Sequence, residues 1–306
     1  MKPIVIGTRG SPLALAQANL TGAALATRHA WDAHTAQAHI ATRIIRTTGD
    51  AIQTSSLAEA GGKGLFTKEI DEAQLRGEVD IAVHSAKDLP TVLPDGLVLA
   101  GYLPREDVRD ALLSRHGPTL ADLPQGALIG SASIRRCAMA RRYRPDLRTA
   151  LLRGSVGTRI ARIEAGEFDA TFLAIAGLNR LGLAGKAAGV IPVETFLPAV
   201  GQGAIAFVAR RDDAATLAQI AAIACVATGH AVTAERAMLA VLDGSCRTPI
   251  AGHARVVDGA LHLNGLVISP DGSAWAEGER HGSVSDAARM GHDLGQDLKA
   301  RSPNLS

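Results

Sequence analysis

Apolar positions in the first two thirds of the chain alternate between short β-rich runs and longer runs with helical spacing. Strands are expected at 4–6, 40–45 and 80–83, with helices from residue 12 and over 66–77. The alternation repeats with strands at 127–129, 149–152 and 170–174 and with helices after residues 133 and 155. Alternating strands and helices are typical of α/β sheets, so the pattern predicts two largely parallel α/β domains.

The last third of the chain follows a different pattern. Helices are expected at 213–226 and 232–242, strands at 250–257 and 261–268, a turn at 271–272, and then a closing helix. This order predicts an α+β module, with an antiparallel sheet and helices on one side.

Proline and glycine cluster near 102–104 and at 197–203, which suggests two crossings between the α/β domains. A strand at 203–210 that returns to the first sheet would make the second domain an insertion in the first. We expect domain 1 over 1–103 with 200–221, domain 2 over 104–199 and domain 3 over 222–306. A cleft between domains 1 and 2 is the expected ligand site.

Charge and composition narrow the class of protein. The 306 residues carry 32 basic and 30 acidic side chains, and only 3% are aromatic. A near-neutral chain with few stacking rings is not typical of a nucleic-acid binder. No apolar run approaches the ~20 residues that cross a bilayer, and the N-terminal apolar stretch is shorter than that of a signal peptide. We expect a cytoplasmic protein that binds neither nucleic acid nor membranes.

The three cysteines lack the spacing of a disulfide framework or a zinc site, and no metal site is expected. Cys137 and Cys225 fall in helical patterns. Cys246 lies in a loop between a helix and a strand, where Arg247 favours its thiolate, so Cys246 is the candidate nucleophile.

Arginine outnumbers lysine 26 to 6, which codon bias alone can produce. The segment 131–162, however, contains nine arginines and one acid, Asp146, for a net charge of +8. Two parts of it share one design, a strand end followed by a small polar residue that opens a helix near arginines. Free backbone N–H groups and guanidinium forks form anion sites. Ligand binding is expected for Arg135, Arg136, Arg153 and Arg159, next to the strand ends, and a solvated face for Arg141, Arg142, Arg144 and Arg148. Ser131, Ser133 and Ser155 either take part in these anion sites or merely cap the helices.

Two further segments carry charged candidates. Lys87 and Asp88 follow the buried strand at 80–83, at the strand end where α/β folds bind ligands. Asp88 is either half of a solvated pair or a carboxylate that stabilises a cationic intermediate. The glycine-rich segment 61–66 lacks the Ser or Thr that follows the lysine of a nucleotide-binding loop. It either presents Lys63 to an anion or forms a simple helix-entry turn.

Eight segments, in family order over nearly the whole chain, closely resemble the porphobilinogen deaminase family, also called hydroxymethylbilane synthases. They are GTRGSPLA at 7–14, GGKGLF at 61–66, AVHSAKD at 82–88, SASIRR at 131–136, LRGSVGTR at 152–159, AGLNRLG at 176–182, LPAVGQGA at 197–204 and GSC at 244–246. The resemblance implies an α/β fold with two type II periplasmic-binding-protein-like domains around a cleft, and a smaller α+β C-terminal domain.

The resemblance also implies a monomeric transferase of tetrapyrrole (haem and porphyrin) biosynthesis. Four porphobilinogen molecules are joined head to tail, with loss of ammonia, into hydroxymethylbilane. The family carries a dipyrromethane cofactor on a thioether, which here corresponds to Cys246.

Site roles follow from the resemblance position by position. Asp88 matches the catalytic carboxylate, Lys63 and Phe66 a loop over the cleft, and Gln202 a hinge position. The residues implied to hold carboxylates are Arg9, Ser11, Lys87, Ser131, Ser133, Arg135, Arg136, Arg153, Ser155, Arg159 and Arg180. The chain departs from the family at Ala132, Ser155 and Ser245, none of which removes a charged group.

Two other classes of protein are weighed against this interpretation. An anion-binding protein without catalysis leaves Cys246 unused. A cysteine hydrolase that pairs Cys246 with His253 leaves the arginine cluster unexplained.

Overall fold

A computed structural model describes residues 3–51, 64, 66–242 and 248–302. The chain divides into two compact units. The first contains the chain up to residue 51, Gly64–Arg105 and Ala204–Gly229, and the second contains Glu106–Gly203 and His230–Ser306.

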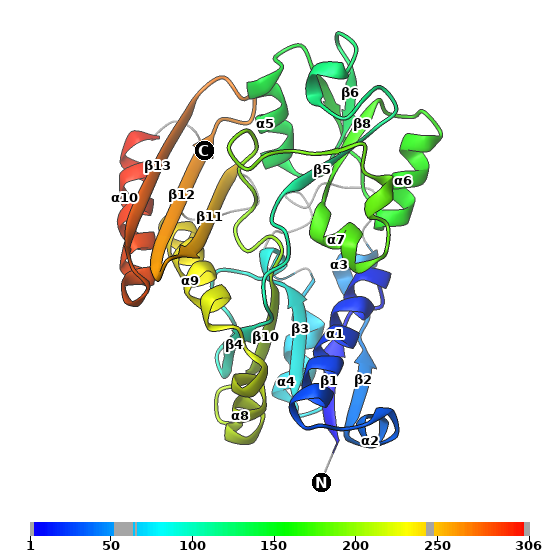
Figure 1. Ribbon diagram of the computed structural model, residues 1–306, viewed down its shortest axis with the longest axis vertical. Coiled ribbons are helices and arrows are strands. Elements are labelled where there is room, and N and C mark those ends of the chain that lie inside the picture. The colour runs from blue at the N-terminus through cyan, green and yellow to red at the C-terminus, as the bar shows by residue number, and fades with distance from the viewer. Residues whose placement is uncertain (1–2, 52–63, 65, 243–247, 303–306) are drawn as a thin grey trace. The chain divides into compact units, whose positions relative to one another are not determined.

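A five-stranded mixed sheet forms the centre of the first unit (Figure 1). Its strand order is β2-β1-β3-β10-β4; β1 runs parallel to β2 and β3, whereas β10 runs antiparallel to β3 and β4. The strand after the second crossing therefore returns to the first sheet. The strands are β1 (Ile4–Thr8), β2 (Ile40–Ile44), β3 (Ile81–Ser85), β4 (Leu97–Tyr102) and β10 (Ile205–Arg210).

Local signals begin and end the helices of this unit. The Ser11 side chain accepts a hydrogen bond from Ala14 N at 3.3 Å, and Pro12 opens the helix α1. The helix α4 ends two residues before the left-handed Gly77, so it is shorter than expected. The helices are α1 (Pro12–Arg28), α2 (Ala33–His39), α3 (Thr48–Ala51), α4 (Lys68–Leu75) and α8 (Ala214–Ile223), with the 3-10 turn η1 (Ala86–Asp88).

A second five-stranded sheet repeats this topology in the second unit. Its order is β7-β6-β8-β5-β9, with β6 parallel to β7 and β8, and β5 antiparallel to β8 and β9. In each sheet the strand that follows a crossing, β10 or β5, lies antiparallel beside the third strand of the parallel set. The strands are β5 (Asp110–Ser114), β6 (Leu128–Gly130), β7 (Arg148–Ala150), β8 (Ala170–Ala174) and β9 (Gly189–Val190).

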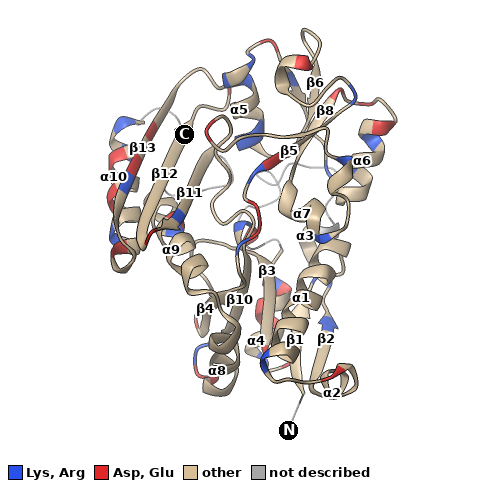
Figure 2. Cartoon of the chain, in the orientation of Figure 1, with Lys and Arg blue, Asp and Glu red and all other residues tan. Residues whose placement is uncertain are grey.

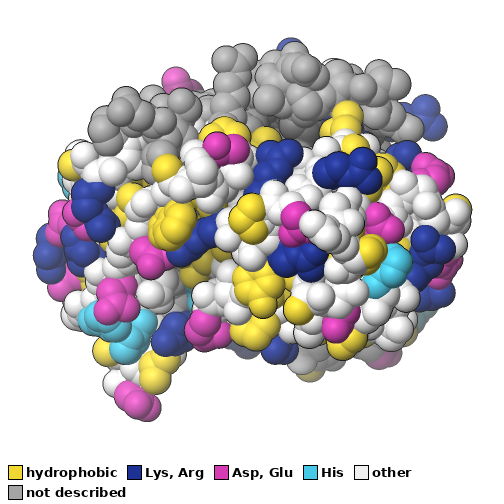
Figure 3. Space-filling model, turned by 90° about the horizontal axis from the view of Figure 1, so that it is seen from above, with side chains coloured by type: hydrophobic (Ala, Val, Ile, Leu, Met, Phe, Trp, Pro, Cys, Tyr) yellow, Lys and Arg dark blue, Asp and Glu magenta, His cyan; other side chains and the backbone are white. Residues whose placement is uncertain are grey.

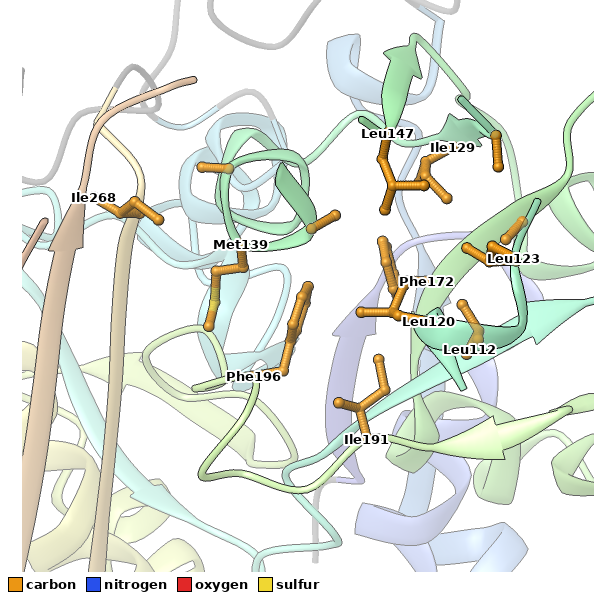
Figure 4. Packing of buried hydrophobic residues seen from close by; sticks show 14 of the residues in the cluster. Leu112, Leu120, Leu123, Ile129, Met139, Leu147, Phe172, Ile191, Phe196 and Ile268 are labelled. Atoms are coloured by element: carbon orange, nitrogen blue, oxygen red, sulfur yellow. The ribbon is translucent and has the colours of Figure 1, made fainter. Parts of the chain in front are cut away.

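The core of this second sheet is rich in large apolar side chains. Phe172 on β8 and Phe196 are fully buried, and their ring centroids lie 5.0 Å apart (Figure 4). Helix α5 adds Met139 to the same cluster. The helical elements here are α5 (Ile134–Tyr143), α6 (Val156–Glu164), α7 (Ile175–Arg180), η2 (Leu120–Asp122) and η3 (Ala184–Lys186).

The C-terminal part of the second unit is an antiparallel meander of β11 (Ile250–Val257), β12 (Ala260–Ile268) and β13 (Trp275–Ser283). Alternate residues of β12 face opposite sides. Leu263 packs in a cluster with helices α9 (Val226–Val241) and α10 (Ala287–Arg301), whereas Leu266 packs in the cluster that contains Met139. The turn η4 (Val284–Asp286) leads into α10.

The predicted fold class is confirmed: two five-stranded sheets of the same topology belong to α/β parts of the chain, and a smaller three-stranded antiparallel sheet belongs to an α+β part. The expectation of largely parallel sheets was wrong at β4, β5, β9 and β10, which pair antiparallel. Helix α9 begins at Val226, six residues before the expected start. Among the described residues no single helix is both long and apolar enough to span a membrane; α8 and α9 pass that test only when taken as a bent pair.

Candidate active site

Asp88 lies on a turn directly after the buried strand β3. The residues from Ile81 to His84 are buried, and the chain then enters η1, where the side chains of Lys87 and Asp88 are exposed. Gln17 on α1 donates a hydrogen bond to Ser85 Oγ at 2.8 Å and holds the end of the strand. A rigid strand thus presents the carboxylate of Asp88 at the carboxyl end of the parallel strands, the edge where α/β folds bind ligands.

Arg9 lies in the loop that follows the neighbouring parallel strand β1. Its Cζ is 4.2 Å from the ring centroid of Phe66, which fixes the guanidinium group over an aromatic face. Burial lowers the pKa of His84 to about 4, and the charge of Arg9 acts in the same direction. The edge of the first sheet therefore joins a cation, Arg9, with an imidazole that stays neutral. The Ser11 side chain caps α1, as described above.

Arg135 and Arg136 open helix α5 in the second unit. Ser133 is the N-cap and accepts from Arg136 N at 3.4 Å, while Ser131 Oγ accepts from Ser133 N at 3.1 Å. The two arginine side chains are only 5% and 8% exposed, and both donate to the fully buried Asp110. The two arginines expected to bind an anionic ligand thus already bind a carboxylate of the protein itself, that of Asp110.

The charge of Asp110 is stabilised by these neighbours. Burial acts to raise the pKa of Asp110, but the charges and hydrogen bonds of Arg135 and Arg136 outweigh burial and hold the pKa well below its ordinary value. The cluster therefore contains one carboxylate and two guanidinium groups.

The second predicted anion segment opens helix α6. Ser155 is the N-cap and accepts from Thr158 N at 3.2 Å, so the serine keeps the capping oxygen. Arg159 Nε donates to Gly154 O at 2.9 Å, and Gly154 has a left-handed φ of +120°. Arg153 and Arg159 are half-buried, and Ser155 is exposed.

Gln202 lies in the second crossing, at 197–203, and Arg180 contacts the same segment. Gln202 Nε2 donates to Asp110 Oδ1 at 2.9 Å and to Val108 O at 2.8 Å. Arg180 Nη2 donates to Gly203 O at 2.5 Å. Gln202 thus joins the arginine cluster, and Arg180 binds the residue next to it.

Three of the four arginines expected on a solvated face are half-buried and anchored. Arg141 donates to Pro270 O at 3.1 Å, and Arg142 donates to Glu277 at 3.0 Å with its Cζ 4.2 Å from the Trp275 ring centroid. Arg144 binds Asp146 through two nitrogens, each at 2.7 Å. Only Arg148 is exposed. These arginines therefore bind neighbouring parts of the second unit. Figure 2 shows the basic positions of α5 in blue.

Two predicted site residues, Lys63 and Cys246, lie outside the described residues. Asp110 was missed at the sequence level, although an acid that opens an apolar strand is a signal for a buried ion pair. Glu235 was missed as well: it is fully buried on α9 and accepts from Gly201 N at 2.7 Å and Ala254 N at 2.6 Å. A lone acid in an apolar helix was the available signal.

The chain is an α/β protein with an exposed carboxylate at a strand end of its first unit and guanidinium groups near two helix N-termini of its second. Residues 4–218 match the family model "Porphobilinogen deaminase, dipyromethane cofactor binding domain", and residues 230–300 match "Porphobilinogen deaminase, C-terminal domain". The chain belongs to the porphobilinogen deaminase family, as the resemblance of its sequence segments predicted.

Curated relatives agree with this assignment. The porphobilinogen deaminase of Nitrobacter hamburgensis is 54% identical over 97% of this chain and 92% of its own length. That of Paracoccus denitrificans is 50% identical over 98% of this chain and 95% of its own length. Among solved structures, the periplasmic aliphatic sulphonate binding protein SsuA from Escherichia coli is 17% identical and covers 78% of this chain and 70% of its own, with a TM-score of 0.42.

Proposed function

We propose that Asp88 is the catalytic carboxylate of this chain and that its arginine side chains bind the carboxylates of the growing product. The activity is that of the family, hydroxymethylbilane synthase: a transferase that joins four porphobilinogen molecules head to tail into hydroxymethylbilane and releases ammonia. The observation that carries the role of Asp88 is its exposed position directly after the buried strand β3.

Each condensation needs a stabilised positive charge. The C–N bond of the aminomethyl group breaks, ammonia leaves, and the methylene carbon becomes a cationic electrophile. The free α-carbon of another pyrrole ring attacks it, a C–C bond forms, and the α-carbon of the attacking ring loses its proton. A fixed carboxylate close to this centre stabilises the developing charge, and we assign that role to Asp88.

The carboxylates of the product require cations. Each pyrrole ring carries one acetate and one propionate, so every added ring adds two negative charges that repel their neighbours. Guanidinium groups bind carboxylates with two parallel hydrogen bonds. We assign this binding to Arg9, Ser11, Lys63, Phe66, Lys87, Ser131, Ser133, Arg135, Arg136, Arg153, Ser155, Arg159, Arg180 and Gln202, whether by direct contact or by support of the arginines.

These residues also suit the dipyrromethane cofactor of this family domain. Its four carboxylates match a donor set of arginines and serine hydroxyls, and Arg135 Nε is buried without a hydrogen-bond partner among the described residues. When bound, the cofactor supplies the free α-carbon to which the first porphobilinogen is added. We propose that Cys246 holds it through a thioether, and that Arg135 and Arg136 hold its carboxylates.

Three further features belong to the proposal. The division into domains at 1–103 with 200–221, 104–199 and 222–306 is supported by the return of β10 to the first sheet. That the protein binds neither nucleic acid nor membranes is supported by the near-neutral charge, because acidic side chains are interspersed with basic ones on the face shown in Figure 3. The monomeric state is carried over from the family resemblance. A cytoplasmic location is supported by the free thiols Cys137 and Cys225.

The proposal is tested with Asp88→Asn, with Asp95→Asn as an exposed control in the same unit. We expect Asp88→Asn to lower turnover by about 100-fold or more, as loss of a preorganised electrostatic contact does, while porphobilinogen still binds. Asp95→Asn is expected to retain full activity. Substantial turnover by Asp88→Asn contradicts the assigned role.

Intact-protein mass spectrometry tests the attachment site separately. We expect the purified wild-type protein to carry the extra mass of two pyrrole units and Cys246→Ser to lack it. A wild-type protein that is fully active without that mass contradicts the cofactor assignment.

A further inference from the structure

Asp110 binds two adjacent arginines through different oxygens. Oδ2 accepts from Arg135 Nη2 at 2.6 Å, and Oδ1 accepts from Arg136 Nη2 at 2.6 Å and Nε at 3.2 Å. Each arginine also donates from Nη1 to a backbone carbonyl oxygen, Arg135 to Leu197 O at 2.7 Å and Arg136 to Phe172 O at 3.0 Å. The orientation of both guanidinium groups is therefore determined by hydrogen bonds to acceptors within the second unit.

This cluster of two guanidinium groups and one carboxylate carries a net positive charge. Two buried guanidinium groups without a counter-charge would repel each other and destabilise the fold. The ionised Asp110 cancels one positive charge and leaves the other, while Arg135 Nε has no hydrogen-bond partner among the described residues. A cluster with one uncompensated positive charge favours an anion over a neutral ligand.

The cluster is also connected to the second crossing, residues 197–203. Asp110 Oδ1 accepts from Gln202 Nε2 at 2.9 Å, and the preceding residue, Gly201, donates its N–H to Glu235 on α9 at 2.7 Å. Leu197, which accepts from Arg135, begins the same segment. The position of the two arginines is thus coupled to the backbone from 197 to 202.

We propose that Asp110 is a positioning residue, which holds Arg135 and Arg136 in the orientation that binds ligand carboxylates and leaves their cluster with one positive charge. Asp110 itself does not contact the ligand. This inference rests on the proposed function of the two arginines in carboxylate binding.

The test uses Asp110→Asn and Asp110→Glu. The amide of Asn keeps the shape of Asp but presents an NH₂ group to an arginine donor and removes the charge; Glu keeps the charge but moves it by one methylene. Asp146→Asn is the matched control, because Asp146 also binds an arginine, Arg144, through both oxygens but lies away from the cluster. Three quantities are measured for each variant: the KM for porphobilinogen, the cofactor mass of the intact protein, and the rise in unfolding temperature with citrate, a tricarboxylate.

We expect Asp110→Asn to raise KM about tenfold or more, which corresponds to loss of one charge-assisted contact. Citrate should raise its unfolding temperature more than that of the wild type, because the added carboxylates replace the missing charge. Asp110→Glu should keep the cofactor mass and still raise KM severalfold. Asp146→Asn should match the wild type in all three quantities.

A KM equal to that of the wild type in Asp110→Glu overturns the inference, and this variant decides the question if Asp110→Asn does not fold. A lower unfolding temperature of Asp110→Asn with unchanged KM and unchanged citrate response also overturns it, because a structural role alone gives that result. Arg135→Gln separates this inference from the proposed function. An unchanged KM in Arg135→Gln refutes carboxylate binding by Arg135, whereas a raised KM there with normal Asp110 variants refutes only the role of Asp110.

Discussion

The guanidinium group of Arg9 lies over the ring of Phe66, with Cζ 4.2 Å from the ring centroid. A cation–π contact of this kind contributes about 0.5–1 kcal/mol at a partly exposed site. We expect Phe66→Leu to raise the KM for porphobilinogen roughly two- to fivefold with little change in kcat, because Arg9 loses its orientation. Phe66→Tyr keeps the aromatic face and should match the wild type. Equal KM values for the Leu and Tyr variants in steady-state kinetics would refute this role of the ring.

His84 predicts a pH dependence of stability. Burial and the charge of Arg9 lower its pKa to about 4 in the folded protein, against an ordinary value near 6.5. The unfolded chain therefore binds the proton more readily, and this contribution to stability is present above pH ~6.5 and is lost as the pH falls towards 4.

The size of this effect is about 1.4 kcal/mol for each pH unit within that window. In urea titrations between pH 7 and pH 5, we expect the free energy of unfolding of His84→Gln to fall less steeply than that of the wild type. His34→Gln, at an exposed position, should keep the wild-type slope. Equal slopes for all three proteins would show that His84 does not titrate as predicted.

At position 203 the backbone passes so close to Glu106 that only glycine, which has no Cβ atom, fits there. The φ of Gly203 is +86°, and a Cβ atom there would lie 2.4 Å from Glu106 O. Gly182 also has a left-handed φ, +68°, but nothing lies within 4 Å of its Cβ position. Gly182→Ala should cost only the backbone strain of about 1–2 kcal/mol, whereas Gly203→Ala should cost clearly more and also raise KM, because Gln202 and Arg180 are displaced. Thermal unfolding and kinetics measure both; equal losses would contradict the close approach.

Arg159 and Arg148 form a matched pair for the anion segment. Each donates its Nε to a glycine carbonyl, Arg159 to Gly154 O at 2.9 Å and Arg148 to Gly126 O at 2.8 Å. Only Arg159 follows the capped start of α6. We expect Arg159→Gln to raise KM about tenfold, the value of one charge-assisted hydrogen bond, and Arg148→Gln to leave it unchanged. A similar KM in the two variants would mean that the arginine excess acts only as general surface charge.

Sequence reasoning found the features that depend on neighbouring residues. Helix starts after Ser133 and Ser155 were predicted because an N-cap hydrogen bond joins positions three apart in the chain. The position of Asp88 after a buried strand was also predicted, since the apolar run at 81–83 ends directly before the polar cluster.

Strand pairing was harder to predict. The expected sheets were largely parallel, yet β5 and β10 run antiparallel to their neighbours, because their direction depends on where the chain re-enters each sheet after a crossing. Strand β5 itself was not predicted, and with it Asp110 was missed.

The sequence by itself determined the family, the strand-end carboxylate and the two arginine-bearing helix starts, because motif order and capping are local properties of the chain. Only the tertiary structure decided what those arginines contact. Arg135 and Arg136 are separated from Asp110 by about 25 positions, and from Gln202 by more than 60, so their cluster exists only once β5 pairs in the second sheet. The hydrogen bonds that orient buried charges depend on such long-range packing, which no short segment of sequence specifies.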